Sequence, residues 1–102
     1  MNDYPTQEQL DKIERWKGSY LELMAYVRQL WHLDGYGFRE SDSKFHLSTG
    51  GWSGNEEIIM ALERNLVFWG LFWLLSRRGG HYVFDKKFMA KLDAEKKHDS
   101  PE

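Results

Sequence analysis

The stretch TGGWSGNEE, residues Thr49–Glu57, predicts a turn that leads directly into a helix. Its three glycines allow the backbone to turn sharply or to approach a ligand closely. Ser53, followed three residues later by Glu56, fits the S/T-x-x-E capping box, and Trp52 then stands where a hydrophobic staple belongs. We therefore expect a helix that is capped by Ser53 and whose apolar face consists of Ile58, Ile59, Leu62 and Leu66.

The residues before this turn predict a β-hairpin. Tyr36–Glu40 is short and aromatic, and Lys44–Ser48 alternates apolar with polar side chains, as a half-buried strand does. Asp42 and Ser43 lie between the two segments and are residues that turns favour. We therefore expect these two strands to pair.

The ten-residue apolar run Leu66–Leu75 admits two interpretations. Its aromatic content and its lack of a polar face favour a buried strand. The next residues support this, because Arg77-Arg78-Gly79-Gly80 resembles a hairpin turn and His81–Phe84 resembles a returning strand. The sequence thus favours a second hairpin, and continuation of the preceding helix through the run stays open as the alternative.

The two ends of the chain are predicted to be helical. Apolar residues recur at helical spacing from Pro5 to Trp31, which favours one long helix with a weak point at Gly18. A short amphipathic helix is expected from Lys86 onward. The predicted fold is α+β: an N-terminal helix, a small antiparallel sheet of hairpins, and one central helix packed on the sheet. We expect a single domain over residues 1–95 and a flexible charged tail over residues 96–102.

Composition narrows the functional classes. Of 102 residues, 41% are apolar and 16% aromatic, which is enough for a hydrophobic core. The formal charge of −2 makes bulk binding of nucleic acid unexpected, so an anion would have to be held by a local patch. The absence of cysteine excludes disulfides, thiolate zinc sites and cysteine nucleophiles. With a polar N-terminus and no apolar run near the roughly 20 residues of a membrane helix, a cytoplasmic protein without a membrane segment is expected.

Two glycine-rich clusters are the candidate binding site. Glycine-rich backbone that leads into a helix start presents N–H groups to an anion, and adjacent arginines supply donors for phosphate or carboxylate. Aromatic side chains nearby would supply stacking area. The candidate ligand-binding residues are Gly50, Gly51, Trp52, Ser53, Gly54, Asn55, Arg77, Arg78, His81 and Tyr82. A purely structural turn and a charged, exposed hairpin tip remain the alternatives for the two clusters.

Catalysis and metal binding have weaker support. Gly51–Asn55 resembles the G-x-S-x-G nucleophile motif, with Asn55 in place of the last glycine, and His81 with Asp85 or Asp34 would have to complete a triad. A helix cap explains Ser53 more simply. The histidines show neither H-x-x-x-H nor H-E-x-x-H spacing, and His32 with Asp34 is at most a fragment of a site. We expect no catalytic residue, no metal ion and no cofactor.

The strings LSTGGWSGNE (Leu47–Glu56) and SRRGGHY (Ser76–Tyr82) resemble a family of small phage and prophage proteins that carries no activity to transfer. The resemblance covers roughly residues 31–85. It implies a phage product that acts in the bacterial cytoplasm, where small phage proteins often counter host defences by binding a defence protein or sequestering a nucleotide signal.

The expected function is therefore non-catalytic binding of an anionic small molecule, nucleotide-like or bearing phosphate or carboxylate, in a counter-defence role. The alternative is an inhibitor that binds a host protein through exposed aromatic anchors. A small hydrolase centred on Ser53 is a remote third possibility. The apolar run Leu66–Leu75 also allows a homo-oligomer, because such segments in small domains are sometimes covered by a second copy.

Overall fold

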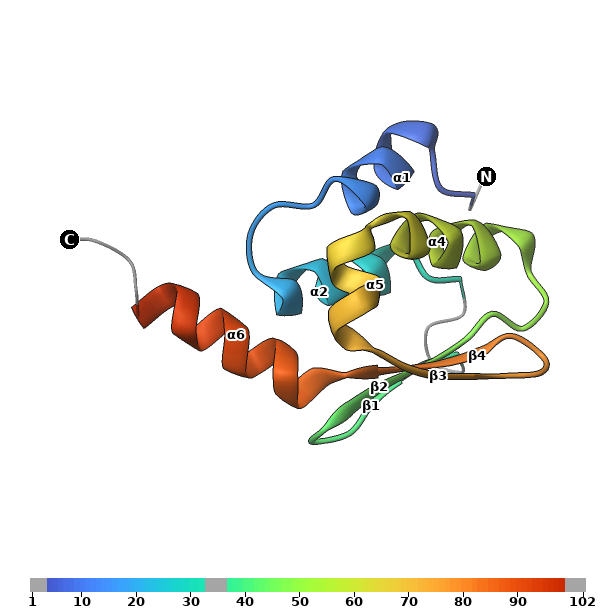
Figure 1. Cartoon of the computed structure of the whole chain (residues 1–102). Helices are drawn as coiled ribbons and strands as arrows, with labels where there is room; N and C mark the ends of the chain where they lie inside the picture. The colour runs from blue at the N-terminus through green and yellow to red at the C-terminus, as the bar shows by residue number, and fades with distance from the viewer. Residues whose placement is uncertain (1–3, 33–36, 99–102) are drawn as a thin grey trace.

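A computed structural model describes residues 4–32 and 37–98, with side chains as far as Glu95. This part of the chain has an α+β fold with five helices and a four-stranded antiparallel sheet (Figure 1). The elements in chain order are α1 (Gln7–Glu14), α2 (Tyr20–Leu30), β1 (Phe38–Glu40), β2 (Lys44–Ser48), α4 (Ser53–Arg64), α5 (Leu66–Phe72), β3 (Trp73–Arg77), β4 (His81–Asp85) and α6 (Lys86–His98).

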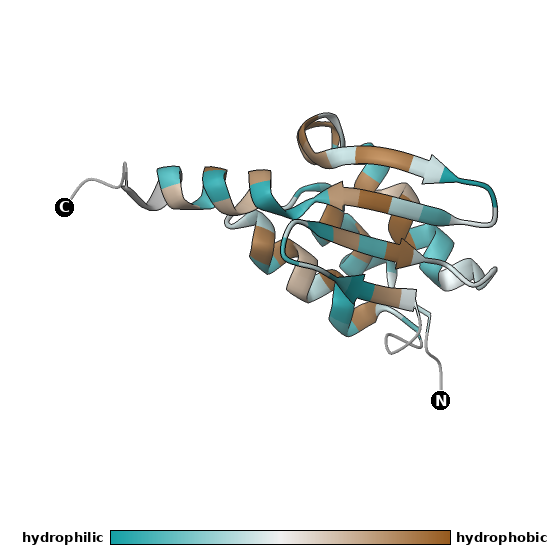
Figure 2. Cartoon of the chain, turned by 90° about the horizontal axis from the view of Figure 1, so that it is seen from below, coloured by the Kyte–Doolittle hydropathy of each residue, from teal (hydrophilic) through white to brown (hydrophobic). Residues whose placement is uncertain are grey.

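The sheet has helices on one face only. Its strand order is β1-β2-β4-β3, with every neighbouring pair antiparallel, so both predicted hairpins form and β2 joins them by pairing with β4. Figure 2 looks onto the sheet from below, with the helices behind it. The predicted single covering helix is replaced by several, because all five helices contribute to one hydrophobic cluster.

Aromatic side chains join the helices to the sheet. Phe68 of α5 lies 5.4 Å, centroid to centroid, from Phe84 of β4, and Phe72 lies 5.3 Å from Phe68. All three are fully buried. Burying such a side chain stabilises the fold by about 1.5–3 kcal/mol, so this aromatic layer fixes which face of the sheet is covered.

The predicted N-terminal helix is two helices. Thr6 forms a capping box with Gln9 at the start of α1, but α1 ends at Glu14 and α2 starts at Tyr20. Gly18, with φ of +118°, occupies backbone space that L side chains rarely adopt, which breaks the helix. Ser19 then caps α2 by accepting the N–H of Glu22. The prediction of one long helix was therefore wrong.

The apolar run Leu66–Leu75 contains both of the structures that the sequence allowed. Asn65 ends α4 and starts α5, because its side chain accepts the N–H of Phe68. Phe68 and Phe72, four residues apart, point into the core from the same helical face. The strand begins only at Trp73, so the preferred all-strand interpretation was wrong for residues 66–72.

The C-terminal helix α6 continues to His98, three residues into the predicted tail, and residues 99–102 lie outside the described residues. None of the helices described is long and apolar enough to cross a membrane.

Candidate functional site

The two glycine-rich clusters meet at one end of the sheet, as the proposed site requires. The N–H of Thr49 donates to the carbonyl of Gly80 at 3.0 Å, and Ser48 pairs with His81 in the register of β2 and β4. Gly80 has a φ of +81°, and a Cβ at this position would collide with the Thr49 hydroxyl. Figure 1 shows the two turns side by side beyond the strands. Close backbone packing, which only glycine allows here, thus joins them.

The first cluster is a turn whose tip is exposed to solvent and whose tryptophan packs on neighbouring residues. Gly50 and Gly51 are exposed, with positive φ and open space where a side chain would project. Trp52 is half-buried and stacks on His32 with ring centroids 4.3 Å apart. Gly54 is buried because the Trp52 ring lies over it. One face of the Trp52 ring is therefore used internally, while Gly50, Gly51 and Ser53 are exposed.

The predicted Ser53 cap is wrong. The helix α4 includes Ser53 as its first residue, and Trp52 is the cap, without a side-chain hydrogen bond to the helix. The Ser53 hydroxyl is hydrogen-bonded at 2.8 Å to the Tyr4 hydroxyl, a residue 49 positions away. Trp52 was predicted to lie in the hydrophobic-staple position, one residue before the cap. It occupies the cap position itself.

Asn55 holds two segments of the chain together through its side-chain hydrogen bonds. Its side chain is buried, its oxygen accepts the N–H of His32 at 2.9 Å, and its amide donates to the carbonyls of His32 and Thr49. These bonds hold the end of the segment after α2 against the turn before α4. Asn55 also lines a small pocket together with Gly50 and Trp52, and its contact with a ligand stays a prediction.

The second cluster divides between the two faces of the sheet. Arg77 and His81 are exposed and directly opposite each other in register, and Arg78 lies in the exposed turn. Tyr82 is half-buried, and its ring makes an edge contact with Trp69 of α5 at 6.2 Å. Tyr82 thus packs against the helices on one side and also lines the hollow described below, and its predicted stacking role stays a prediction.

The uncovered face carries basic side chains around a shallow hollow of about 400 Å³. Along β1 and β2, Phe38, Phe45 and Leu47 are buried towards the helices, so the residues between them project from the open face. The register of the four strands places residues of every strand on this face. The polar residues that line the hollow are Arg39, Lys44, His46, Ser48, Arg77 and His81.

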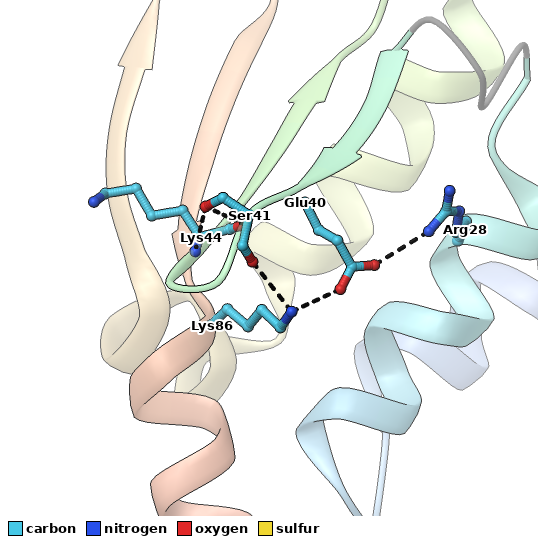
Figure 3. A network of polar contacts seen from close by, with 5 residues as sticks. All are labelled: Arg28, Glu40, Ser41, Lys44 and Lys86. Carbon is cyan, nitrogen blue, oxygen red and sulfur yellow. Dashed lines mark hydrogen bonds and ion pairs between the residues drawn. The ribbon is translucent and has the colours of Figure 1, made fainter.

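Carboxylates are largely kept away from this hollow. Glu40 points towards the helices and forms ion pairs with Arg28 at 3.1 Å and Lys86 at 2.8 Å (Figure 3). Asp85 lies at the far end of the open face, opposite Lys44, and one of its oxygens accepts the N–H of Phe88 at the start of α6. Among the described residues, no ion pair joins Arg39, Lys44 or Arg77 to a carboxylate. The hollow is therefore a local region of positive charge.

One hydrogen bond organises the edge of the hollow that faces the turns. The Ser48 hydroxyl lies 2.6 Å from His81 Nδ1. This bond fixes the orientation of the imidazole ring beside Arg77. The Ser48 hydroxyl, the His81 imidazole and the Arg77 guanidinium thus lie in one row across three strands. Together they can donate hydrogen bonds to the oxygens of a phosphate or carboxylate group.

The residues of the suggested hydrolase do not form a triad. The Ser53 hydroxyl bonds to Tyr4, His81 bonds to Ser48, and Asp85 bonds to the backbone of Phe88. Asp34, the other candidate acid, lies outside the described residues. Within residues 4–32 and 37–98, no three His, Asp or Glu side chains lie close enough together to hold a metal ion.

Sequence reasoning missed four polar residues of the hollow: Arg39, Lys44, His46 and Ser48. The alternation in Lys44–Ser48 already placed three of them on one side of a strand. What the sequence did not contain was the pairing of β2 with β4, which brings that side next to Arg77 and His81.

No protein family, characterised protein or solved structure shows a significant match to this chain.

Proposed function

We propose that this chain is a non-catalytic binding protein that holds an anionic ligand, bearing phosphate or carboxylate groups, on the uncovered face of its sheet. The observation that carries the proposal is the hollow itself: Arg39, Lys44 and Arg77 line it without a carboxylate partner among the described residues. Unpaired cations on one face are an electrostatic site for an anion, even in a chain whose formal charge is −2.

The positions of the two arginines bear on the size of the ligand. Arg39 and Arg77 come from the outer strands β1 and β3 of the four-stranded sheet. Three strand spacings separate these strands, a distance of about 14 Å between backbones. A ligand that engages both guanidinium groups therefore spans the sheet, which favours a molecule with two or more anionic groups over a single small anion.

Recognition in this proposal depends on anionic groups and not on aromatic stacking. Tyr82 and Trp52, the two residues expected to stack on a base, are committed to internal contacts with Trp69 and His32. The row Ser48, His81 and Arg77 supplies hydrogen-bond donors instead. Gly50, Gly51 and Arg78, exposed at the same end of the sheet, form the rim of the site.

The biological setting is also a proposal. It is supported by the resemblance of Leu47–Glu56 and Ser76–Tyr82 to small phage proteins. A phage product that binds a multiply charged phosphate compound in the host cytoplasm would act in counter-defence by lowering the free concentration of that compound. The alternative, an inhibitor that binds a host protein through exposed aromatic anchors, has less support. Among the described residues, Trp73 is the one tryptophan with a substantially exposed side chain, at 41%.

A thermal-shift screen tests the proposal. The panel contains pyrophosphate, mononucleotides, cyclic and linear dinucleotides, short oligonucleotides and citrate. A ligand at 100 times its Kd stabilises the protein by about 2.7 kcal/mol, which raises the Tm by several degrees. We expect such a shift for ligands with several anionic groups, lost in Arg77→Glu and retained in Lys91→Glu, an exposed charge reversal on α6. A panel without any shift, or equal shifts in both variants, would contradict the proposal.

A further inference from the structure

We propose that the apolar surface formed by α5 and β3 is covered by a second copy of this chain. This surface, called the α5–β3 patch, consists of Leu66, Val67, Leu71, Trp73, Leu74 and Leu75, which are 37–79% exposed. Leu75 also lines the hollow, so the patch adjoins the open face. It lies at the edge of the sheet, since β3 has a neighbour on one side only. In Figure 2 it is the brown part of the edge strand and of the helix that precedes it.

The patch has the apolar area that a dimer needs. The exposed fractions of its six members together equal about three whole side chains, on the order of 500 Å² if a large apolar side chain has roughly 150–200 Å². The largest apolar patch on a typical monomer measures about 300–600 Å² and is often functional, so this patch has the size of an interaction surface. A standard interface buries about 800 Å² on each partner, of which about 56–65% is apolar, so the apolar part is close to 500 Å².

Charge favours a second copy over a different protein. Residues 66–75 contain no charged side chain, and the nearby Arg64 is paired with Glu14 at 3.1 Å. A two-fold contact places the same patch on both sides, so an uncharged patch meets itself without like-charge repulsion. A different partner is normally selected by complementary charges, which this patch does not offer.

The shape of α5 suits such a contact. Leu66, Val67 and Leu71 lie on one stripe of α5, with Gly70 among them. Gly70 is exposed, and no atom lies within 4 Å of where its Cβ would stand. The backbone at Gly70 therefore lets an opposing helix approach closely. The irregularity between Trp73 and Leu75 shortens the regular part of β3, so α5 supplies most of the contact.

Sedimentation velocity of the full chain over a range of concentrations tests this inference. We expect a dimer that persists in 1 M NaCl, because burial of apolar surface is not screened by salt. Leu66→Glu should raise the dissociation constant at least about tenfold, because it places a carboxylate in an apolar interface. Ala25→Glu, on the exposed side of α2, should not change it. Leu66 is 79% exposed, so its replacement leaves the monomer folded, which circular dichroism checks.

A cross-linking experiment locates the interface. The natural chain has no cysteine, so Val67→Cys and Ala25→Cys each introduce a single thiol. With a short bismaleimide we expect dimers from Val67→Cys and none from Ala25→Cys. A wild-type chain that sediments as a monomer at every concentration would overturn the inference, as would a dimer that Leu66→Glu leaves intact. Anion binding at the hollow is measured separately, so either proposal can fail without the other.

Discussion

Gly80 holds the two turns of the candidate site together. Its positive φ and the closeness of the Thr49 hydroxyl both exclude a side chain. Gly80→Ala should therefore destabilise the fold by more than Gly79→Ala, which carries only the cost of the left-handed conformation, about 1–2 kcal/mol. Gly79 has a φ of +89°, and its Cβ would meet only the His81 ring, at ordinary contact distance, which makes it a matched control. Urea denaturation measures both, and equal losses would contradict the account.

At the residue scale, the capping-box pattern does not by itself decide where a cap forms. Thr6 forms a capping box with Gln9, and Ser19 caps α2 although its hydroxyl also donates to Asp93, far along the chain. Ser53 fitted the same pattern but bonds to Tyr4. Asn55, which sequence reasoning assigned to a ligand, binds the backbone of His32 and Thr49. Hydrogen bonds to residues far along the chain decided both outcomes, and no short motif encodes them.

At the scale of elements, α6 caps α2 from a distance. The Asp93 carboxylate accepts the Ser19 hydroxyl at 2.7 Å and the N–H groups of Tyr20 and Leu21 at 2.9 and 3.0 Å. A carboxylate at a helix N-terminus satisfies otherwise unpaired donors and interacts favourably with the helix dipole.

Asp93→Ala should destabilise the protein by about 1–3 kcal/mol, because it leaves these partly buried donors unsatisfied. Hydrogen exchange at the amides of Tyr20 and Leu21 should accelerate more than exchange elsewhere in α2. Glu95→Ala, an exposed carboxylate two residues along α6, is the control and should leave both quantities unchanged. Protection at Tyr20 and Leu21 that survives Asp93→Ala would show that the carboxylate does not cap α2.

Tyr26 on α2 should make stability depend on pH under alkaline conditions. Burial raises the pKa of its phenol above the usual 10.0, and the negative charge of Glu8 raises that pKa further. The folded state thus holds the proton more tightly than the unfolded chain. This contribution is complete below about pH 10 and is lost as pH rises through the folded pKa. Between pH 9 and 11 the wild type should lose slightly more stability than Tyr26→Phe; parallel curves would refute this.

Elements of clear periodicity were predictable, and the apolar run was not. Lys44–Ser48 became a strand as its alternation indicated, because one side faces the core. In Leu66–Leu75 almost every residue is apolar, so neither a helical nor a strand period stands out. The boundary at Trp73 follows from the fit of Phe68 and Phe72 against the sheet, which is tertiary packing.

At the scale of the whole molecule, two adjoining surfaces are left uncovered by residues 4–32 and 37–98. One is the basic open face with its hollow, and the other is the apolar α5–β3 patch. The sequence predicted the fold class and three of the residues that line the hollow, Arg77, His81 and Tyr82. It could not reveal Arg39 as a neighbour of the site, because the strand order β1-β2-β4-β3 connects segments that are distant in the chain.

Charge reversal at Arg39 tests the central claim most directly, because Arg39 belongs to the open face and lies on the strand farthest from the Arg77 turn. Isothermal titration with the best-binding polyanion of the panel would compare the wild type, Arg39→Glu and Lys91→Glu. We expect Arg39→Glu to weaken binding about tenfold or more. The substitution removes a charge-assisted hydrogen bond that contributes about 1.5–3 kcal/mol and places a carboxylate against the anionic ligand. Lys91→Glu should bind as the wild type does. Unchanged affinity in Arg39→Glu would contradict binding across the sheet.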